Sequence, residues 1–242
     1  MQYLLIHAIE DGIESQDGRA ADSLSALNVW LEEVIRLGVD LQGSRLGPAS
    51  DATTVRVRGG EVLLTDGPFA ETKEQVAGYD ILECENIDDA VGWAAQHPTA
   101  HLGSIEVRPL FGDPPRTILP EPKAMTKRYL LIVCVEEGLQ LSPEESRRVG
   151  PATEEWVARA EGSGARLYGS RLEAVNTART VRRGSAQVIV TDGPFAETKE
   201  QIAGFDVLEC ADLDEALDLA AAHPVARFGA MEVRPLWPFD DA

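Results

Sequence analysis

The residues best suited to chemistry lie in an eleven-residue polar block that occurs twice. TDGPFAETKEQ runs from Thr65 to Gln75 and again, letter for letter, from Thr191 to Gln201. Carboxylates are common general acids and bases, and lysine can hold an anion or stabilise a developing oxyanion. A packing core usually accepts swaps of similar volume, so an unchanged polar run favours a functional site.

Six residues of the block are therefore candidates for acid–base catalysis. They are Asp66 and Asp192, Glu71 and Glu197, and Lys73 and Lys199. The aspartate would be the base, and the glutamate and lysine would complete the cluster. Each has a structural alternative, because the aspartate can close a turn by accepting backbone N–H groups and the other two can be a solvated charged run. The Gly-Pro-Phe centre of the block is typical of a turn and an apolar plug.

A second set of residues is predicted to contact substrate. They are Arg45 and Arg171 in the repeated GSR, Thr72 and Thr198 in the block, and His7. Arginine binds carboxylates through two parallel hydrogen bonds, and a salt bridge to a glutamate of the block is an equal alternative. Strand alternation places His7 on the face of Leu5 and Ile9, and its counterpart in the second copy is Val133. If that face lines a cleft between the repeats, the first repeat contributes a group that titrates near neutrality and the second does not. Otherwise His7 is a polar core residue.

Other polar residues are predicted to be structural. Four arginines alternate with apolar residues in strand-like segments, which predicts that they face outward; they are Arg56, Arg182, Arg108 and Arg234. His97 and His223 end helical segments, where a cation would offset the helix dipole. The cysteines are predicted to be small buried hydrophobes, and no Cys or His spacing resembles a zinc site. We therefore expect no metal and no cofactor.

The duplication extends well beyond the block. With a constant displacement of 126 residues, Tyr3–Leu110 aligns without a gap to Tyr129–Leu236, and 49 of 108 pairs are identical. We therefore predict one domain over residues 1–111 and a second over 128–238. The segment 112–127 contains four prolines and is predicted to be a semi-extended linker.

Each copy has the pattern β-α-β-hairpin-β-α-β. Buried strands open the copies, the first helices end at Gly38 and Gly164, and a hairpin turn is predicted at Gly59-Gly60. In the second copy, Pro151 predicts a short helix and then another that begins near Ala152. This order indicates an α+β fold of two ferredoxin-like units. Because helices cover only one face of such a sheet, we predict that the copies pair as a pseudo-dimer.

Composition limits the classes of partner. With 242 residues and 44% hydrophobic content, the chain can bury two cores, and no apolar run approaches the length of a membrane helix. The net charge of −19 argues against nucleic acid, because duplex binding depends on lysine and arginine that displace counterions. The N-terminal sequence lacks the features of a signal peptide, so we expect a cytoplasmic protein that does not bind membranes.

The block, the glycine-aromatic pairs Gly78-Tyr79 and Gly204-Phe205, and the closing EVRPL resemble the YCII-related family, in its DGPF type. The resemblance covers both repeats nearly end to end. It implies a dimeric α/β-barrel built from two ferredoxin-like units, here joined as a tandem duplication, with a cleft between facing sheets. The family's histidine lies near the first helix, and no histidine lies between His7 and His97. The family's His–Asp pair therefore does not transfer directly, whereas the aspartate of the block does.

The resemblance implies two functions, and whether the chain is an enzyme at all stays open. The first is a cofactor-independent small-molecule enzyme of lyase or isomerase type. The second is a non-catalytic ligand-binding or regulatory module, which family members linked to sigma-factor genes suggest. A third hypothesis is that the block is only an interlock between the repeats, so that Lys73→Ala would destabilise the fold strongly. A further homodimer also stays open.

Overall fold

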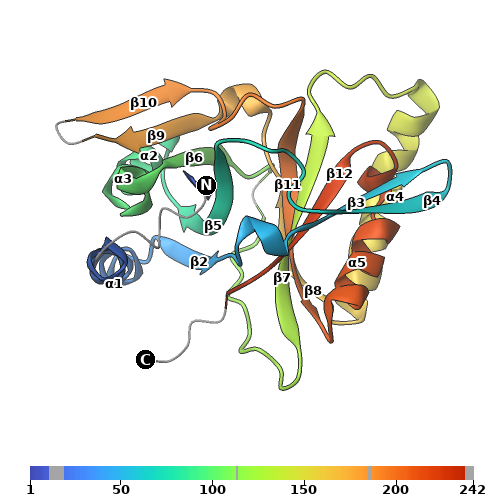
Figure 1. The fold of residues 1–242 in the computed structure, drawn as a ribbon, viewed down its shortest axis with the longest axis horizontal. Helices are drawn as coiled ribbons and strands as arrows, with labels where there is room; N and C mark the ends of the chain where they lie inside the picture. The colour runs from blue at the N-terminus through green and yellow to red at the C-terminus, as the bar shows by residue number, and fades with distance from the viewer. Residues whose placement is uncertain (11–18, 113, 185–186, 238–242) are drawn as a thin grey trace. The chain divides into compact units, whose positions relative to one another are not determined.

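The computed structural model describes residues 1–10, 19–112, 114–184 and 187–237, with side chains omitted for 19–23. The described strands form two antiparallel six-stranded sheets, so the α+β class is confirmed (Figure 1). The chain divides into two compact units, and each combines segments from both repeats. Unit 1 contains Met1–Pro48, Glu71–Ile118 and Leu172–Glu197; unit 2 contains Ala49–Ala70, Leu119–Arg171 and Thr198–Ala242.

Unit 1 has the sheet order β10-β9-β6-β1-β5-β2. Its strands are β1 (Gln2–Glu10), β2 (Asp40–Arg45), β5 (Glu74–Glu83), β6 (Ser104–Pro109), β9 (Arg179–Arg183) and β10 (Val188–Asp192). Its helices are α1 (Arg19–Arg36), α2 (Ile87–Gln96) and α3 (Thr99–Leu102), with a 3-10 turn, η3 (Val175–Thr177). The helices pack on the sheet face that carries Tyr3, Leu5 and Ile105, and Trp30 of α1 is buried there.

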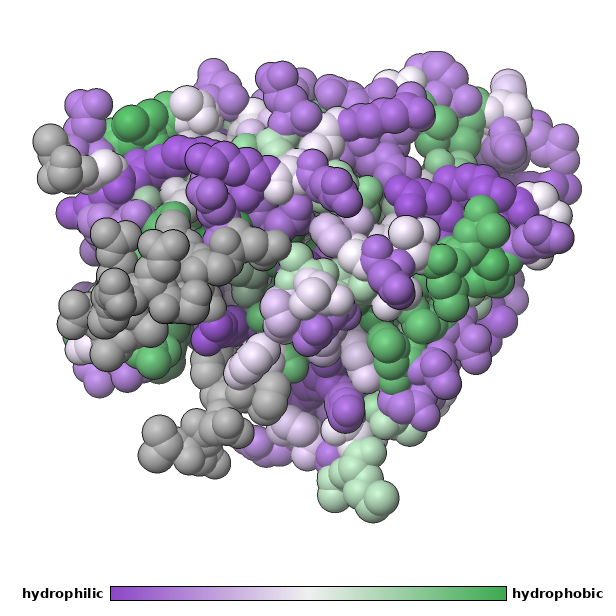
Figure 2. Space-filling model, viewed as in Figure 1, coloured by the Kyte–Doolittle hydropathy of each residue, from purple (hydrophilic) through white to green (hydrophobic). Residues whose placement is uncertain are grey.

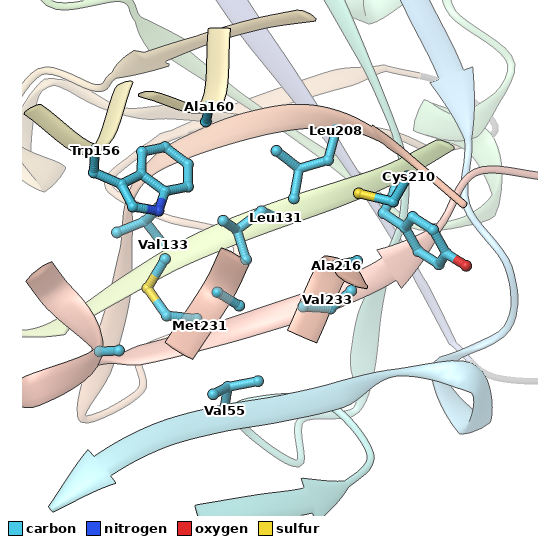
Figure 3. Packing of buried hydrophobic residues seen from close by; sticks show 13 residues of the cluster. Val55, Leu131, Val133, Trp156, Ala160, Leu208, Cys210, Ala216, Met231 and Val233 are labelled. Carbon is cyan, nitrogen blue, oxygen red and sulfur yellow. The ribbon is translucent and has the colours of Figure 1, made fainter. Parts of the chain in front are cut away.

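Unit 2 has the matching order β4-β3-β12-β7-β11-β8. Its strands are β3 (Thr53–Arg58), β4 (Glu61–Asp66), β7 (Lys127–Glu136), β8 (Arg166–Arg171), β11 (Glu200–Cys210) and β12 (Ala230–Pro235). Its helices are α4 (Pro143–Gly162) and α5 (Leu213–Ala222), with the 3-10 turns η2 (Ala49–Asp51) and η4 (Pro224–Arg227). Figure 3 shows its core, in which Trp156 of α4 lies near Val133 and Met231 of the sheet.

The two hairpins are exchanged between the repeats. The β3–β4 hairpin of the first repeat pairs with β12 of the second, with Val55 opposite Met231. In the same way, β9 of the second repeat pairs with β6 of the first, with Val181 opposite Ile105. Val55 and Val181 are fully buried in the cores that they join. The predicted repeats, 1–111 and 128–238, describe the duplication, whereas each compact unit draws on both.

The hairpins end in edge strands with exposed apolar side chains. Val62, Leu63 and Leu64 of β4 are each about half exposed, and so are the three apolar residues of β10. Figure 2 shows apolar surface over the β3–β4 hairpin of unit 2. Gly59 and Gly60 both have positive φ, as the predicted turn requires. The turn of the second hairpin lies outside the described residues.

Helix boundaries follow the sequence with one exception. Gly38 and Gly164 adopt positive φ after α1 and α4, as predicted. Ser142 and Glu145 form a reciprocal capping box at the start of α4. The predicted break at Pro151 is wrong, because α4 continues through it. Proline removes one helical hydrogen bond, which can kink a helix without ending it, and the flanking turns keep their pairing.

Three further findings concern burial. Trp30 and Trp156 are core residues, and the three cysteines are free and buried, as predicted for the cysteines. Among the described helices, none is both long and apolar enough to cross a membrane.

Candidate functional site

The polar block is divided between the two units. Asp66 ends β4 in unit 2, whereas Glu71 and Lys73 lead into β5 in unit 1. The second copy is also divided, but at a later residue, with Asp192 and Glu197 in unit 1 and Lys199 in unit 2. The predicted acid–base cluster therefore draws its members from separate compact units.

All six predicted catalytic side chains are exposed. Lys73 Nζ lies 3.4 Å from Glu10 and is 81% exposed, and Lys199 forms the equivalent pair with Glu136 at 3.2 Å. Asp192 lies 3.2 Å from Arg179 Nε and is 87% exposed. Ion pairs at such surfaces contribute about 0–1 kcal/mol and leave both groups in contact with water. These surroundings are typical of solvated charges.

The Gly-Pro-Phe centre of the block anchors the exchanged hairpin. Gly67 has a φ of 98°, donates its N–H to Ala52 O at 2.8 Å, and accepts the Thr54 hydroxyl at 2.8 Å. The next anchor is Phe69, whose N–H donates to Glu232 Oε2 at 3.0 Å. In the second copy the Phe195 N–H donates to Glu106 Oε2 at 3.1 Å. The predicted turn is confirmed, and it ties each hairpin to a glutamate of the other repeat.

Those two glutamates belong to buried ion pairs. Glu106 pairs with Arg108, and Glu232 with Arg234 at 2.6 Å; all four side chains are 1% exposed. The prediction that Arg108 and Arg234 face outward is therefore wrong. A buried carboxylate beside a guanidinium keeps a second oxygen for the backbone N–H of the block, which satisfies a charge that would otherwise be costly to bury.

The second half of the block is also held by the exchanged hairpins. Arg182 binds Glu74 Oε2 at 2.6 Å, and Ser104 Oγ donates to the same oxygen at 2.7 Å. The counterpart pair joins Arg56 to Glu200 at 2.5 Å. Arg56 and Arg182, predicted to face outward, are 27% and 40% exposed, and they make ion pairs within their sheets.

The predicted substrate-binding residues lie in different surroundings. Thr72 and Thr198 donate their hydroxyls to the backbone oxygens of Glu74 and Glu200, which is a local turn contact. Arg45 and Arg171 end β2 and β8 opposite Gly78 and Gly204. Arg45 is half-buried and Arg171 is exposed.

His7 lies in a buried polar cluster on the helix-covered face of unit 1. Its Nε2 lies 2.9 Å from Asp80 Oδ2, and the side chains are 10% and 8% exposed. In the β1–β5 register, His7 faces Gly78 and Leu5 faces Asp80, so the pair is diagonal across the two strands. Burial raises the pKa of Asp80, but the imidazoles of His7 and His97 outweigh it and hold that pKa below its ordinary value. The pair is thus an aspartate–histidine dyad with an ionised carboxylate.

Two glycines shape the space around the dyad. Gly43 of β2 faces Asp80, and a Cβ there would lie 1.9 Å from Asp80 Oδ1. A Cβ at Gly78 would lie 3.0 Å from the Ser44 backbone oxygen and 3.4 Å from His7 Nδ1. A β-bulge between His7 and Ala8 adjoins the dyad. Any other residue at Gly43 would displace the carboxylate.

His97 completes the cluster as a neutral ring. Its Nδ1 accepts the Thr99 N–H at 3.1 Å, and its ring lies 4.3 Å from that of His7 and 4.6 Å from Trp30. Burial and the neighbouring His7 lower the pKa of His97 to about 3. Burial likewise lowers the pKa of His223 to about 4. The structural role predicted for these histidines holds, but they are neutral acceptors rather than cations.

The cluster does not fit a metal ion. His7, Asp80 and His97 are a group of described residues whose potential ligand atoms lie within 4.8 Å of one another. Since His97 Nδ1 accepts a backbone N–H, the neutral ring keeps its proton on Nε2, the atom that lies 3.7 Å from Asp80 Oδ2. A protonated nitrogen has no lone pair for a metal, and metal-binding histidines normally donate through their other nitrogen.

Asp40 is a fourth polar residue beside the dyad. It opens β2 opposite Leu82 and is half-buried. Burial and the nearby Asp80 raise the pKa of Asp40 to about 6, against the effect of Arg116. Two carboxylates with opposite pKa shifts thus lie on one face of the sheet.

Unit 2 has a different arrangement at the same positions. Val133 replaces His7 and Arg166 replaces Asp40. The Arg166 Nε donates to Asp206 Oδ1 at 2.6 Å, and both side chains are less than a tenth exposed. Gly169 faces Asp206 as Gly43 faces Asp80. The aspartate therefore has a permanent cation in unit 2 and a titratable partner in unit 1.

Sequence reasoning selected His7 but missed its partners. The signal was present, because the glycine of GSR and the aspartate of AGYD and AGFD occur in both copies. A glycine and an aspartate that persist together in neighbouring strands indicate that a carboxylate occupies the space of a missing side chain. The change of Asp40 to Arg166 and of His7 to Val133 could then have been read as a coupled exchange.

Comparison with known proteins places the chain in a family. Residues 1–112 and 128–240 each match the YCII-related domain, and the chain belongs to that family as a tandem duplication. An uncharacterized protein of Rhizobium meliloti (strain 1021) is 39% identical over 99 residues, which cover 40% of this chain and 77% of that protein. One repeat thus corresponds to most of that relative.

Proposed function

We propose that this protein is a small-molecule enzyme that uses general acid–base catalysis, with His7 of unit 1 as the base. The observation that carries the proposal is the buried contact of 2.9 Å between His7 Nε2 and Asp80 Oδ2. A histidine oriented by a carboxylate is a common arrangement for proton abstraction near neutral pH.

The dyad determines which nitrogen of His7 acts. We place the proton of the neutral ring on Nε2, which lies 2.9 Å from Asp80 Oδ2, so that the lone pair is on Nδ1. The Nε2 atom is buried, and the exposed tenth of the His7 side chain therefore belongs to its other atoms. Abstraction of a substrate proton by Nδ1 gives an imidazolium that Asp80 stabilises. Return of that proton to another substrate atom completes an isomerisation, and its transfer to a leaving group completes an elimination.

We assign the polar block mainly to hairpin anchoring. The contacts of Phe69 and Phe195 with buried glutamates support this role, as do the arginine contacts of Glu74 and Glu200. Catalysis by Asp66, Glu71 and Lys73 and their repeats stays a prediction from the sequence. The expected barrel-like pairing of the units, their cleft and a further homodimer likewise stay proposals, as do the repeat and linker boundaries.

A substrate screen followed by matched variants tests the proposal. Thermal-shift screening of a metabolite panel identifies ligands, because a ligand that binds only the folded state raises its apparent stability. Turnover of a hit is then compared between His7→Gln and Asp66→Asn. We expect His7→Gln to lower kcat by about 10²-fold or more and Asp66→Asn to leave it near the wild-type value.

Two results would redirect the proposal. Loss of turnover in Asp66→Asn, with full activity in His7→Gln, would assign catalysis to the block. Saturable binding without turnover of any ligand would favour the ligand-binding or sigma-factor-associated module. Both variants replace polar side chains. Circular dichroism therefore first verifies that each variant is folded, and turnover is compared only afterwards.

A further inference from the structure

We propose that unit 1 binds a cationic group, an alkylguanidinium or a primary ammonium, between Asp40 and Asp80. This names a substrate class for the proposed acid–base site and so rests on that function, although binding itself is measurable without turnover. The inference comes from unit 2, where the chain's own arginine occupies the corresponding position.

Arg166 shows how the site accepts a cation. Its Nε donates to Asp206 Oδ1 at 2.6 Å, and its guanidinium is nine-tenths buried. A Cβ at Gly169 would lie 2.1 Å from that carboxylate oxygen and 2.6 Å from Arg166 Nη2. The guanidinium and the carboxylate therefore lie together over a glycine in strand β8.

Unit 1 keeps the carboxylate and the glycine but lacks the cation. The corresponding Cβ position at Gly43 lies 1.9 Å from Asp80 Oδ1, and its next nearest atoms are Asp80 Cγ and the Tyr79 backbone oxygen, both at 3.0 Å. Leaving out the chain neighbours of Gly43, only Asp80 Oδ1 lies closer to this point than 3.0 Å, whereas Arg166 Nη2 lies 2.6 Å from the corresponding point in unit 2. His7 binds Oδ2 of Asp80, so Oδ1 faces β2 and the position of the missing guanidinium.

Asp40 changes the charge of this position from positive to negative. Its Oδ1 is buried and has no hydrogen-bond partner among the described residues. Unit 2 has the permanent cation of Arg166 between Asp206 and the half-exposed Glu161, whereas unit 1 has two carboxylates and one histidine, with His97 neutral and Arg116 about half exposed. Burial, and after it the nearby carboxylate of Asp80, raise the pKa of Asp40. A bound cation would neutralise Asp40 and donate to Asp80 Oδ1, as Arg166 donates to Asp206.

The cluster thereby differs from an ordinary pair of surface acids. Asp80 is 6% exposed and already oriented by His7 and Gly43. Its counterpart, Asp206, binds a guanidinium in the same chain. Charge-assisted hydrogen bonds to a preorganised, partly desolvated carboxylate are stronger than neutral ones. A substrate held there by its cationic end would lie beside the imidazole of His7.

Titration followed by NMR tests this site directly. Ethylguanidinium and ethylammonium are added to the full chain while the backbone amides of Gly43 and Asp80 are monitored, with tetramethylammonium as a control that cannot donate hydrogen bonds. We expect saturable shifts with the first two ions. In Asp40→Asn the affinity should fall by about tenfold or more, the loss of one charge-assisted hydrogen bond. In Asp40→Arg the shifts should be absent, because the new guanidinium occupies the site.

Arg166→Ala provides the matched control in unit 2. Removal of the native guanidinium should create saturable shifts at Gly169 and Asp206 with ethylguanidinium. Absence of saturation in wild type, equal shifts with tetramethylammonium, or unchanged affinity in Asp40→Asn would overturn the inference. If Asp40→Arg fails to fold, the affinity measured for Asp40→Asn still tests the inference. His7→Gln should bind the cation but lose turnover, so failure of this inference and failure of the acid–base proposal give different results.

Discussion

The two units keep the same aspartate and differ in what neutralises it. In unit 2 Arg166 supplies a permanent charge to Asp206 and also pairs with the half-exposed Glu161. In unit 1 His7 supplies a titratable partner, and Asp40 adds a second carboxylate. A buried carboxylate must be compensated for the fold to be stable, and arginine achieves this without any function. We therefore propose the functional site in unit 1, where the partner of the aspartate is titratable and a second carboxylate lies nearby.

The aspartate sites differ between the two units, whereas the contacts that hold the exchanged hairpins are the same in both. Glu106→Ala and Glu232→Ala should each lower the free energy of unfolding by about 3–5 kcal/mol, since each leaves a buried guanidinium without its carboxylate. Urea denaturation of the two variants measures this. Nearly equal losses would support symmetrical anchoring, and a loss below about 1 kcal/mol in either would refute it. Glu71→Ala, at an exposed position, is the control.

The carboxylate of Asp40 should have a smaller, pH-dependent effect. Its pKa is raised from 3.8 to about 6, so its contribution to stability is fully present below 3.8 and is lost as the pH rises through about 6. Asp40→Asn should therefore stabilise the protein above that range, by about 1 kcal/mol after allowance for partial exposure, and should have little effect in acid. Thermal unfolding over this pH range provides the measurement.

Arg166→Gln is the counterpart of that variant in unit 2. It should destabilise the protein at every pH at which Asp206 is ionised, because the buried carboxylate loses its cation. If the two variants changed stability in the same direction at neutral pH, the contrast between the units would be wrong.

The smallest effect is expected in the polar block itself. Lys73 is 81% exposed and pairs with the half-exposed Glu10, so Lys73→Ala should change the free energy of unfolding by at most about 0.5 kcal/mol. Lys199→Ala should behave alike. A loss of several kcal/mol would instead support the hypothesis that the lysine interlocks the repeats.

Much of the local structure is predictable, because it depends on local signals. The β-α-β-hairpin-β-α-β order, the C-terminal glycines of the helices and the turn at Gly59-Gly60 all follow from the sequence. The hairpin exchange does not. Glu106 and Glu232 lie in identical EVRPL segments, so the sequence offers each hairpin two equivalent strands to join. Only the connection lengths and packing of the folded chain distinguish them.

The candidate site was predictable only in part. His7 differs from its repeat counterpart and so draws attention, but its partner Asp80 lies more than seventy residues away. The block has the stronger sequence signal, and we assign its repetition mainly to the anchor contacts that it makes in both copies. In this duplicated chain, the block that is identical in both copies supplies contacts that hold the fold. Positions 7 and 40, which differ between the copies, belong to the candidate site.

The tautomer of His7 tests the central claim most directly. Long-range ¹H–¹⁵N correlation spectra distinguish the two nitrogens of each imidazole, and they are recorded over a pH series so that the neutral form of the ring is identified directly. We expect His7 to carry its proton on Nε2, held by Asp80, with Nδ1 unprotonated; in Asp80→Asn this preference should weaken. A wild-type His7 protonated on Nδ1 would contradict the account, because the proposed base would then have no lone pair.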